Sequence, residues 1–127
     1  MTNKRQQEYT CAMDAALNVI SGKWKLVILN RLLAGPQRYS EIHKSIPGLT
    51  EKVLSQQLKE LEEDKIVKRK VYPVVPPKVE YSFTELGEEL QPIFFALESW
   101  GSNFLTETNA DGEQVKADAS CYTGNKI

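Results

Sequence analysis

The stretch PGLTEKVLSQQLKELEEDKIVKRK, residues 47–70, decides the fold that we predict for this chain. Three leucines in it recur at helical spacing and share one face: Leu54, Leu58 and Leu61. Polar side chains lie on the opposite face and its flank: Lys52, Ser55, Gln56 and Lys59. Thr50 can cap this helix through its hydroxyl, and we expect the helix to end near Asp64. The pattern indicates a helix that packs its leucines into a domain and presents its polar face to solvent or to a ligand.

A shorter helix and a β-ribbon flank this stretch. Before it, Ser40 is expected to cap the short helix, and Pro47-Gly48 forms a turn. After it, the chain is rich in Val, Ile, Tyr and Phe, and it is interrupted by prolines. Two strands, Val67–Tyr72 and Lys78–Ser82, are therefore predicted, with a proline-bearing tip between them.

Further helices are predicted at both ends of the chain. Two of them span about residues 10–20 and 23–34, and Thr84 can cap a long last helix that Pro92 kinks or divides. An apolar stripe runs along this last helix: Leu86, Leu90, Phe94, Leu97, Trp100 and Phe104. The stripe is too apolar for so small a domain to cover, so we expect these six residues to form the interface of a homodimer. The alternative is a helix that folds back as a lid on its own core.

Length and composition favour a soluble globular protein. The chain has 127 residues, of which 41% are hydrophobic and 26% charged. We expect a frayed N-terminus over 1–9, one domain over 10–107 and a polar, flexible tail over 108–127. Neither a run of 18 apolar residues nor a signal peptide is found, so a cytoplasmic protein without a membrane partner is predicted. Two cysteines and one histidine show no metal-ligand spacing, and we expect neither a metal nor a cofactor.

The charge is unevenly distributed along the chain. The formal net charge is −1, yet residues 23–80 contain 12 Lys/Arg and 7 Asp/Glu, a net charge of +5, and the remainder has a net charge of −6. A basic middle segment can bind a polyanion, although two halves of a chain often differ in charge by chance.

The order of the elements predicts a winged helix-turn-helix fold: mainly α with a small antiparallel β wing (α+β), extended by N- and C-terminal helices. A helix fits the major groove of double-stranded DNA when one face is packed and the other carries donors and acceptors. The predicted base contacts are Lys52, Ser55 and Gln56. The predicted backbone contacts are Thr50, Lys59, Lys68, Arg69, Lys70 and Lys78. An acidic cluster should lie away from the duplex: Glu60, Glu62, Glu63 and Asp64.

Four blocks of sequence carry a resemblance to a known family. They are CAMDAALNVISGKW (11–24), RYSEI (38–42), IPGLTEKVLSQQLKELEED (46–64) and VPPKVEYSFTELG (75–87). In this order they resemble the HxlR-type family of bacterial winged-helix transcription regulators. The resemblance implies a homodimer that is held by its terminal helices, binds an inverted-repeat operator and acts as a repressor. It also implies regulation by a reactive small molecule at the position of Cys11. Ser21 stands where the family often has glycine.

Cys11 has two interpretations. Its place near the start of a helix favours the thiolate, whereas Asp14 opposes it by charge repulsion. A lone cysteine is more often a small buried structural residue, but the family resemblance makes an oxidant or electrophile sensor an equally good hypothesis. Cys121, in the predicted tail, could then form a disulfide with an oxidised Cys11.

Two other function classes stay open at this stage. A winged-helix module that binds protein instead of DNA would keep the leucines and the apolar stripe but would not need the cations of the ribbon. A thiol enzyme using Cys11 would need a partner base, and His43 is the one histidine. Because no further nucleophile or oxyanion motif accompanies that pair, we predict that the chain is not an enzyme.

Overall fold

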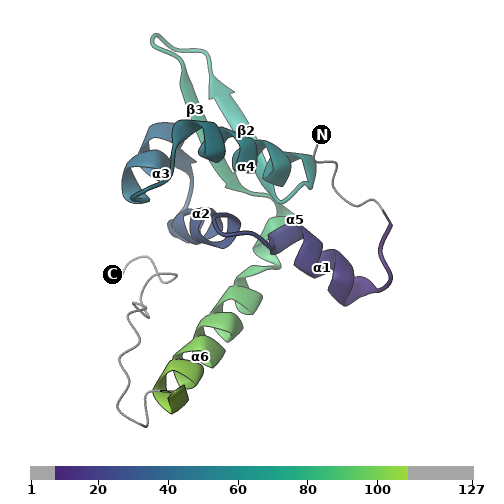
Figure 1. The fold of residues 1–127 in the computed structure, drawn as a ribbon. Coiled ribbons are helices and arrows are strands. Elements are labelled where there is room, and N and C mark those ends of the chain that lie inside the picture. Colours follow the sequence, from purple (N-terminus) through teal and green to yellow (C-terminus); the bar gives the residue numbers. More distant parts are fainter. Residues whose placement is uncertain (1–7, 109–127) are drawn as a thin grey trace.

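A computed structural model describes residues 8–108 of the chain, and Cys121 and the predicted tail after residue 108 lie outside that part. The elements are α1 (Ala12–Ile20), α2 (Lys25–Arg31), the 3₁₀ turn η1 (Leu32–Ala34), β1 (Gln37–Arg38), α3 (Tyr39–Ser45), α4 (Glu51–Glu63), β2 (Val67–Tyr72), β3 (Lys78–Phe83), α5 (Glu85–Glu88) and α6 (Gln91–Thr108). The predicted fold class is confirmed, since most elements are helices and one small antiparallel sheet accompanies them (Figure 1).

The helix-turn-helix unit consists of α3, a tight turn and α4. Gly48 occupies the turn with φ +83°, a conformation in which a side chain would be strained. Thr50 caps α4 as predicted, because its Oγ1 accepts a hydrogen bond from the Val53 N–H at 3.1 Å. The turn and the cap together set the direction in which α4 leaves α3.

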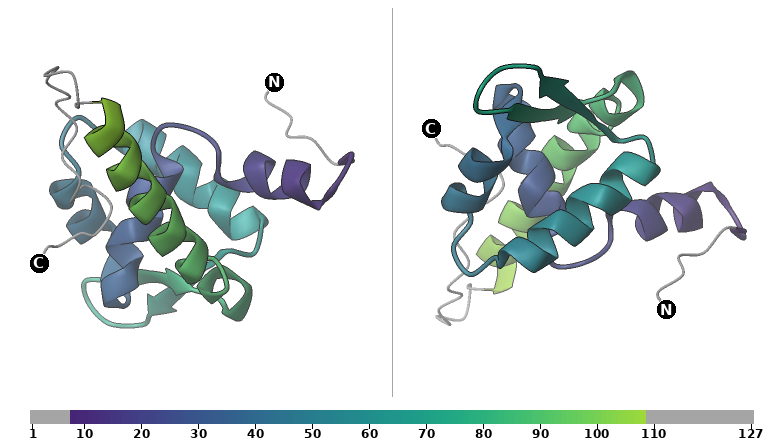
Figure 2. Two further views of the ribbon diagram at one scale, coloured as in Figure 1. Left: turned by 90° about the horizontal axis from the view of Figure 1, so that it is seen from below. Right: turned by 90° about the horizontal axis from the view of Figure 1, so that it is seen from above.

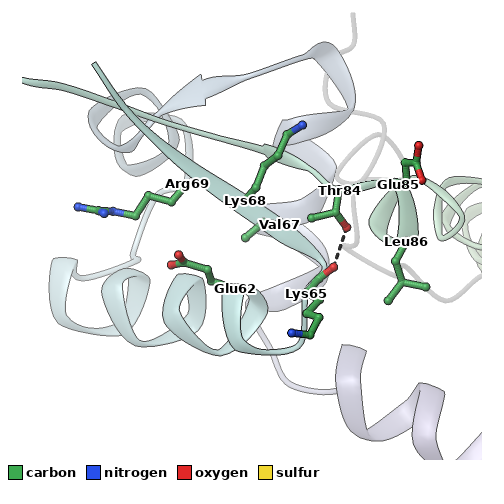
Figure 3. A pocket seen from close by; sticks show the side chains of 8 residues that line it. All are labelled: Glu62, Lys65, Val67, Lys68, Arg69, Thr84, Glu85 and Leu86. Carbon is green, nitrogen blue, oxygen red and sulfur yellow. Dashed lines mark hydrogen bonds between the residues drawn. The ribbon is translucent and has the colours of Figure 1, made fainter. Parts of the chain in front are cut away.

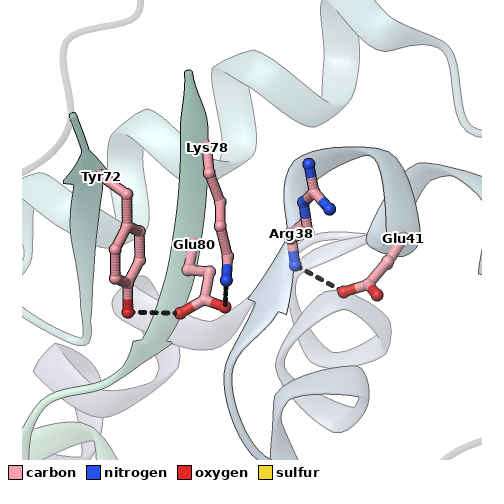
Figure 4. Close-up of polar contacts among 5 residues, drawn as sticks. All are labelled: Arg38, Glu41, Tyr72, Lys78 and Glu80. Atoms are coloured by element: carbon pink, nitrogen blue, oxygen red, sulfur yellow. Dashed lines mark hydrogen bonds and ion pairs between the residues drawn. The ribbon is translucent and has the colours of Figure 1, made fainter. Parts of the chain in front are cut away.

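The start of α3 differs from the prediction. Ser40 is not the N-cap, because α3 begins at Tyr39 and Ser40 already lies in the first turn. Arg38 precedes the helix in an extended conformation, and its N–H donates to Glu41 Oε1 at 2.8 Å (Figure 4). The glutamate at the third position of the helix therefore accepts from the N–H of the N-cap residue, which is one half of a capping box.

The end of α4 is closed by a residue in the left-handed conformation. Lys65 has φ +65°, and its N–H donates to the Glu62 carbonyl at 3.0 Å. The next N–H, of Ile66, donates to the Leu61 carbonyl at 2.9 Å. These two bonds form a Schellman motif in which a lysine occupies the position that usually holds glycine. The motif turns the chain directly from α4 into β2.

The sheet has three strands in the order β1-β3-β2, and both pairings are antiparallel. The two predicted strands are confirmed, and β3 extends one residue further, to Phe83. The longest pairing runs from Val67 opposite Phe83 to Tyr72 opposite Lys78. β2 and β3 thus form the ribbon of the wing, and β1 ties its base to the start of α3.

The core lies between α2, α3, α4 and the inner face of the ribbon. The three leucines of α4 are almost fully buried, with Leu54, Leu58 and Leu61 exposed by 0%, 1% and 0%. They pack with residues from the other elements: Ile28, Leu29, Leu32, Ile42, Ile46, Val67, Tyr81 and Phe83. The predicted inner face of α4 is therefore confirmed, and its polar face is left pointing outward.

The predicted last helix is divided in two, as Pro92 led us to expect. Thr84 caps α5 by accepting a hydrogen bond from the Gly87 N–H at 2.9 Å. The second helix, α6, starts at Gln91 and has Pro92 in its first turn. Proline is tolerated there because the N–H groups of the first turn have no partner within the helix. A Cβ on Gly87 would lie 2.1 Å from the Ile66 carbonyl oxygen, so α5 packs against the ribbon only with glycine there. α6 extends away from the rest of the domain in Figure 1, and α1 does so in Figures 1 and 2.

Candidate nucleic-acid interface

The outer face of α4 carries the side chains that were predicted to contact bases. Lys52, Ser55, Gln56 and Lys59 are all exposed, whereas the leucines between them are buried. The helix therefore has one packed face and one face of donors and acceptors, the arrangement that a helix needs in order to enter a major groove.

Ser55 is held by a residue of the preceding helix. The hydroxyl of Tyr39 donates to the Glu51 carbonyl at 3.0 Å and lies 2.9 Å from Ser55 Oγ. Because a phenol has a single hydrogen, Ser55 is the donor in the second contact. The lone pairs of Ser55 Oγ then remain as its acceptor sites. The sequence offered no sign of this contact between α3 and α4.

Gln56 is also held, on the other flank of α4. Its Nε2 donates to Glu60 Oε2 at 2.8 Å, and Glu60 Oε1 forms an ion pair with Lys25 Nζ of α2 at 2.7 Å. The side chains of Lys25 and Glu60 are only 5% and 15% exposed. Glu60 was predicted, with Glu62, Glu63 and Asp64, to lie away from the duplex, yet its carboxylate lies beside Gln56, which is a predicted base contact.

The outer face of the ribbon carries a cluster of cations around one tyrosine. Lys70 Nζ and Lys78 Nζ lie 4.9 and 4.7 Å from the ring centroid of Tyr72, which are cation–π distances. The Tyr72 hydroxyl donates to Glu80 Oε1 at 3.0 Å, and Lys78 Nζ lies 3.4 Å from Glu80 Oε2 (Figure 4). The hydrogen bond from Tyr72 and the charge of Lys78 lower the pKa of Glu80.

The cations of β2 do not share one face. Side chains alternate along a strand, so Lys68 and Lys70 lie on the face that carries Tyr72, and Arg69 lies on the face of the buried Val67. Figure 3 shows the side chains of Lys68 and Arg69 pointing to opposite sides of the strand. Arg69 is thus on the side of the ribbon nearest α4. An open depression lies at this junction, lined by Glu62, Lys65, Val67, Lys68, Arg69, Thr84, Glu85 and Leu86.

Cys11 is exposed, which argues against a buried structural cysteine within this chain. It is the N-cap residue of α1 and makes no capping hydrogen bond through its side chain. The backbone N–H of Asp14, and then that of Met13, favour the thiolate and lower the pKa of Cys11. Asp14 was expected to oppose the thiolate, but its main effect comes from its backbone N–H. Its carboxylate accepts from the N–H and hydroxyl of Thr10 at 3.1 and 3.3 Å.

The apolar stripe of the last helix divides into one buried residue and a mostly exposed set. Phe94 is 7% exposed and packs against Phe83 with ring centroids 6.4 Å apart, so it belongs to the core of the chain and not to an outer surface. Leu90 is half-buried. The other predicted interface residues are exposed: Leu86 by 51%, Leu97 by 46%, Trp100 by 66% and Phe104 by 49%. Met13 and Leu17 of α1 are exposed by 68% and 55%.

Comparison with known proteins identifies the family. The HxlR-like helix-turn-helix family matches residues 19–109. The chain belongs to this family. The HTH-type transcriptional regulator YkvN of Bacillus subtilis is 47% identical over 107 residues, which are 84% of this chain and 91% of YkvN. An HTH-type transcriptional regulator of Methanothermobacter thermautotrophicus is 43% identical over 108 residues, 85% of this chain and 82% of that protein. This HxlR-like chain is accordingly a transcriptional regulator of the helix-turn-helix type.

Solved structures of a redox regulator and of another transcriptional regulator share the fold. The redox regulator HypR in its reduced form superposes with a TM-score of 0.70 and 42% identity, over 80% of this chain and 95% of HypR. The reduced form of the transcriptional regulator YodB from B. subtilis has a TM-score of 0.69 and 38% identity, over 75% of this chain and 94% of YodB. Between residues 8 and 108, this HxlR-like protein has no helix long and apolar enough to span a membrane.

Proposed function

We propose that this HxlR-like protein is a homodimeric repressor that binds an inverted-repeat operator in double-stranded DNA. The observation that carries the proposal is the two-faced burial of α4. Its leucines are buried, whereas Lys52, Gln56 and Lys59 are exposed on the opposite face, next to a cationic ribbon. In this proposal α4 enters the major groove, and the ribbon lies along the sugar-phosphate backbone.

The proposed contacts follow from the position of each side chain. Lys52, Ser55 and Gln56 contact base edges, while Thr50 and Lys59, at the margins of the exposed face, contact phosphates. Arg69, on the side of the ribbon nearest α4, contacts the phosphates that border the groove occupied by α4. The cations of the outer face contact phosphates further along the duplex: Lys68, Lys70 and Lys78. Glu80 neutralises part of the charge of Lys78, which makes Lys78 the weakest of the three contacts.

A second copy of the chain is the proposed cover for the terminal helices. Trp100 and Phe104 stack on one another, with ring centroids 5.4 Å apart and ring planes 12° apart, yet both stay largely exposed. Large apolar surfaces of this kind usually mark a protein interface. A two-fold dimer through α1 and α6 would place two copies of α4 about one DNA turn apart, ~34 Å, to contact two half-sites.

The experiment that tests the function is a binding titration. The purified protein is titrated with DNA from upstream of its own gene and with random DNA, over a series of salt concentrations. We expect tighter binding to the upstream DNA and a steep loss of affinity with salt. Arg69→Ala should weaken binding to both DNAs alike and reduce the salt slope by about one, because it removes one phosphate contact. Weak, equal binding to both DNAs would favour the protein-binding module instead.

Regulation through Cys11 is the finer part of the proposal. Its exposure and lowered pKa, together with the likeness to the redox regulator HypR, support attack of the Cys11 thiolate on an oxidant or electrophile. Such a modification would change the dimer and thereby the affinity for the operator. Operator binding by the wild type should change after treatment with diamide or a quinone, whereas Cys11→Ser should bind DNA before treatment and not respond. An unchanged response in Cys11→Ser would remove the sensor role.

A further inference from the structure

Gln56 is the one predicted base-contacting residue whose amide is tied to a buried ion pair. Glu60 lies one turn further along α4 and accepts from Gln56 Nε2 at 2.8 Å. An exposed pair of this kind stabilises an isolated helix only slightly. Here the carboxylate is also bound to Lys25 Nζ at 2.7 Å, from a different helix, and both charged side chains are largely shielded from water. The acceptor is therefore held in place by the tertiary structure.

The chemistry of the two groups decides which way the amide points. A carboxylate only accepts hydrogen bonds, so it is Nε2 and not Oε1 that faces Glu60. One of the two hydrogens on Nε2 is committed to that bond. Gln56 can therefore offer a partner one hydrogen and the oxygen next to it, and a flip of the amide would place two acceptors against each other.

One donor beside one acceptor is the pattern that complements adenine. In the major groove adenine presents the N6 amino donor next to the N7 acceptor, whereas guanine presents two acceptors, N7 and O6. A glutamine without a fixed partner can turn its amide and donate to guanine as well. A glutamine whose amide is held by a carboxylate accommodates guanine less well, because its oxygen would meet a second acceptor.

Lys25 has a second consequence for this arrangement. An uncompensated carboxylate close to a DNA-binding face would be repelled by phosphates. The ion pair neutralises Glu60 and leaves its second oxygen available to Gln56. Lys25 thus allows an acidic residue to stand beside the DNA-contacting face.

We propose that Glu60, anchored by Lys25, is a positioning residue that sets the base preference of Gln56 and makes it select adenine over guanine. This inference rests on the proposed function, in which α4 enters the major groove. It assigns a role in specificity to two residues that make no contact with DNA themselves.

The test uses the full chain and duplexes selected from a random pool. Gln56→Ala first identifies the base position that Gln56 contacts, since preference should relax at one position in each half-site. Affinities are then measured for operators with adenine or guanine at that position. The wild type should prefer adenine by roughly 5- to 150-fold, the range expected for a bidentate pair.

Two matched double variants separate positioning from stability. Lys25→Met with Glu60→Met removes both charges, so no buried charge is left without a partner. It should lower the adenine-to-guanine ratio by about an order of magnitude, because the amide of Gln56 is free to turn. Lys25→Met with Glu60→Gln has the same net charge as the first double variant but keeps an acceptor oxygen at position 60. It should therefore retain more of the preference for adenine over guanine. Thermal unfolding of both variants checks that they fold.

A measurement on the wild type alone covers the case in which either variant fails to fold. The Nε2 hydrogen of Gln56 that donates to Glu60 should exchange with solvent severalfold more slowly than the other hydrogen of the same amide, as followed by NMR in the absence of DNA. Equal exchange rates would overturn the inference.

The outcomes distinguish this inference from the function on which it rests. If the wild type selects no sequence, the proposed function fails and the inference fails with it. If the wild type binds specifically but prefers guanine, or if the ratio persists in Lys25→Met/Glu60→Met, the regulator stands and the role of Glu60 is overturned. If Gln56→Ala relaxes the base preference at no position of the operator, the role of Glu60 is likewise overturned while the regulator function is retained.

Discussion

The helix-turn-helix body, from α2 to β3, and the terminal helices α1 and α6 differ in how far they bury their apolar side chains. In the body, the three leucines of α4 are at most 1% exposed and belong to a core that includes residues of α2, α3, β2 and β3. In α6, Trp100 is 66% exposed although it is the largest apolar side chain of that helix, and Met13 of α1 is 68% exposed. Both regions have helical apolar periodicity, but only the body buries it among the described residues.

This difference indicates how the two regions are stabilised. The body gains its hydrophobic free energy within one chain, so its stability should not need a partner. The exposed apolar residues of the terminal helices gain theirs only when another surface covers them, so their contribution should depend on the protein concentration. Four predictions test or sharpen this contrast, from the largest expected effect to the smallest.

The largest effect is expected in the body. Leu58→Ala removes a side chain that is 1% exposed from the centre of the core. The free energy of unfolding should fall by ~2–5 kcal/mol, because both the transfer free energy and the packing around the new cavity are lost. Denaturant unfolding measures this loss. A change below about 1 kcal/mol would mean that the core can collapse around this position or that α4 is packed less tightly than described.

A smaller effect, of a different kind, is expected in α6. Trp100→Ala should weaken self-association by ~2 kcal/mol, roughly 30-fold in the dissociation constant, as for a central aromatic residue of an interface. Analytical ultracentrifugation over a range of concentrations measures it. Val75→Ala is the control, since Val75 is 98% exposed at the tip of the wing and lies in neither terminal helix. Equal dissociation constants for wild type and Trp100→Ala would place the dimer interface elsewhere.

The third prediction concerns the end of α4. Lys65 occupies the left-handed region at φ +65°, where a Cβ costs ~1–2 kcal/mol. Lys65→Gly should therefore stabilise the body by about 1 kcal/mol, after the greater freedom of glycine in the unfolded chain is subtracted. Lys65→Ala keeps the Cβ and should change little, so a comparison of the two variants in thermal unfolding isolates the backbone effect. A destabilised Lys65→Gly would show that the lysine side chain matters more than the backbone.

The smallest effect is expected in the wing. The hydrogen bond from Tyr72 lowers the pKa of Glu80 in the folded protein, so this contact stabilises the wing above the ordinary pKa of glutamate. That contribution disappears as the pH falls through the folded pKa, because the carboxylate becomes protonated. Tyr72→Phe should raise the pKa of Glu80 towards its ordinary value, as measured by an NMR titration. An unchanged pKa would assign the shift to Lys78 instead.

Much of the body could be predicted from local patterns. The leucine spacing of α4, the cap at Thr50 and the strand Val67–Tyr72 each depend on interactions within a few residues, and all three are confirmed. The division of the last helix followed from Pro92 for the same reason. The predicted cap of α3 was wrong, although it is also local, because α3 begins one residue before Ser40 and Glu41 accepts from the N–H of the actual N-cap residue, Arg38.

The candidate site was predicted less completely than the fold. The sequence placed Lys52, Ser55 and Gln56 on the exposed face of α4, but the contacts that hold two of them come from elsewhere in the chain. Tyr39 reaches Ser55 from α3, and Lys25 holds Glu60 beside Gln56 from α2. Phe94 looked like a member of the exposed stripe, yet the approach of α6 to Phe83 takes it into the core.

The sequence by itself determined that this chain is a winged helix-turn-helix protein with an amphipathic α4, because periodicity, caps and turns act over one or two turns of backbone. Only the tertiary structure decided how the polar face of α4 is held, which cations of the ribbon lie nearest α4, and which aromatic residues stay exposed. These properties depend on pairs of side chains that are distant along the chain. Their proximity is set by the packing of α2, α3 and α6 around the core.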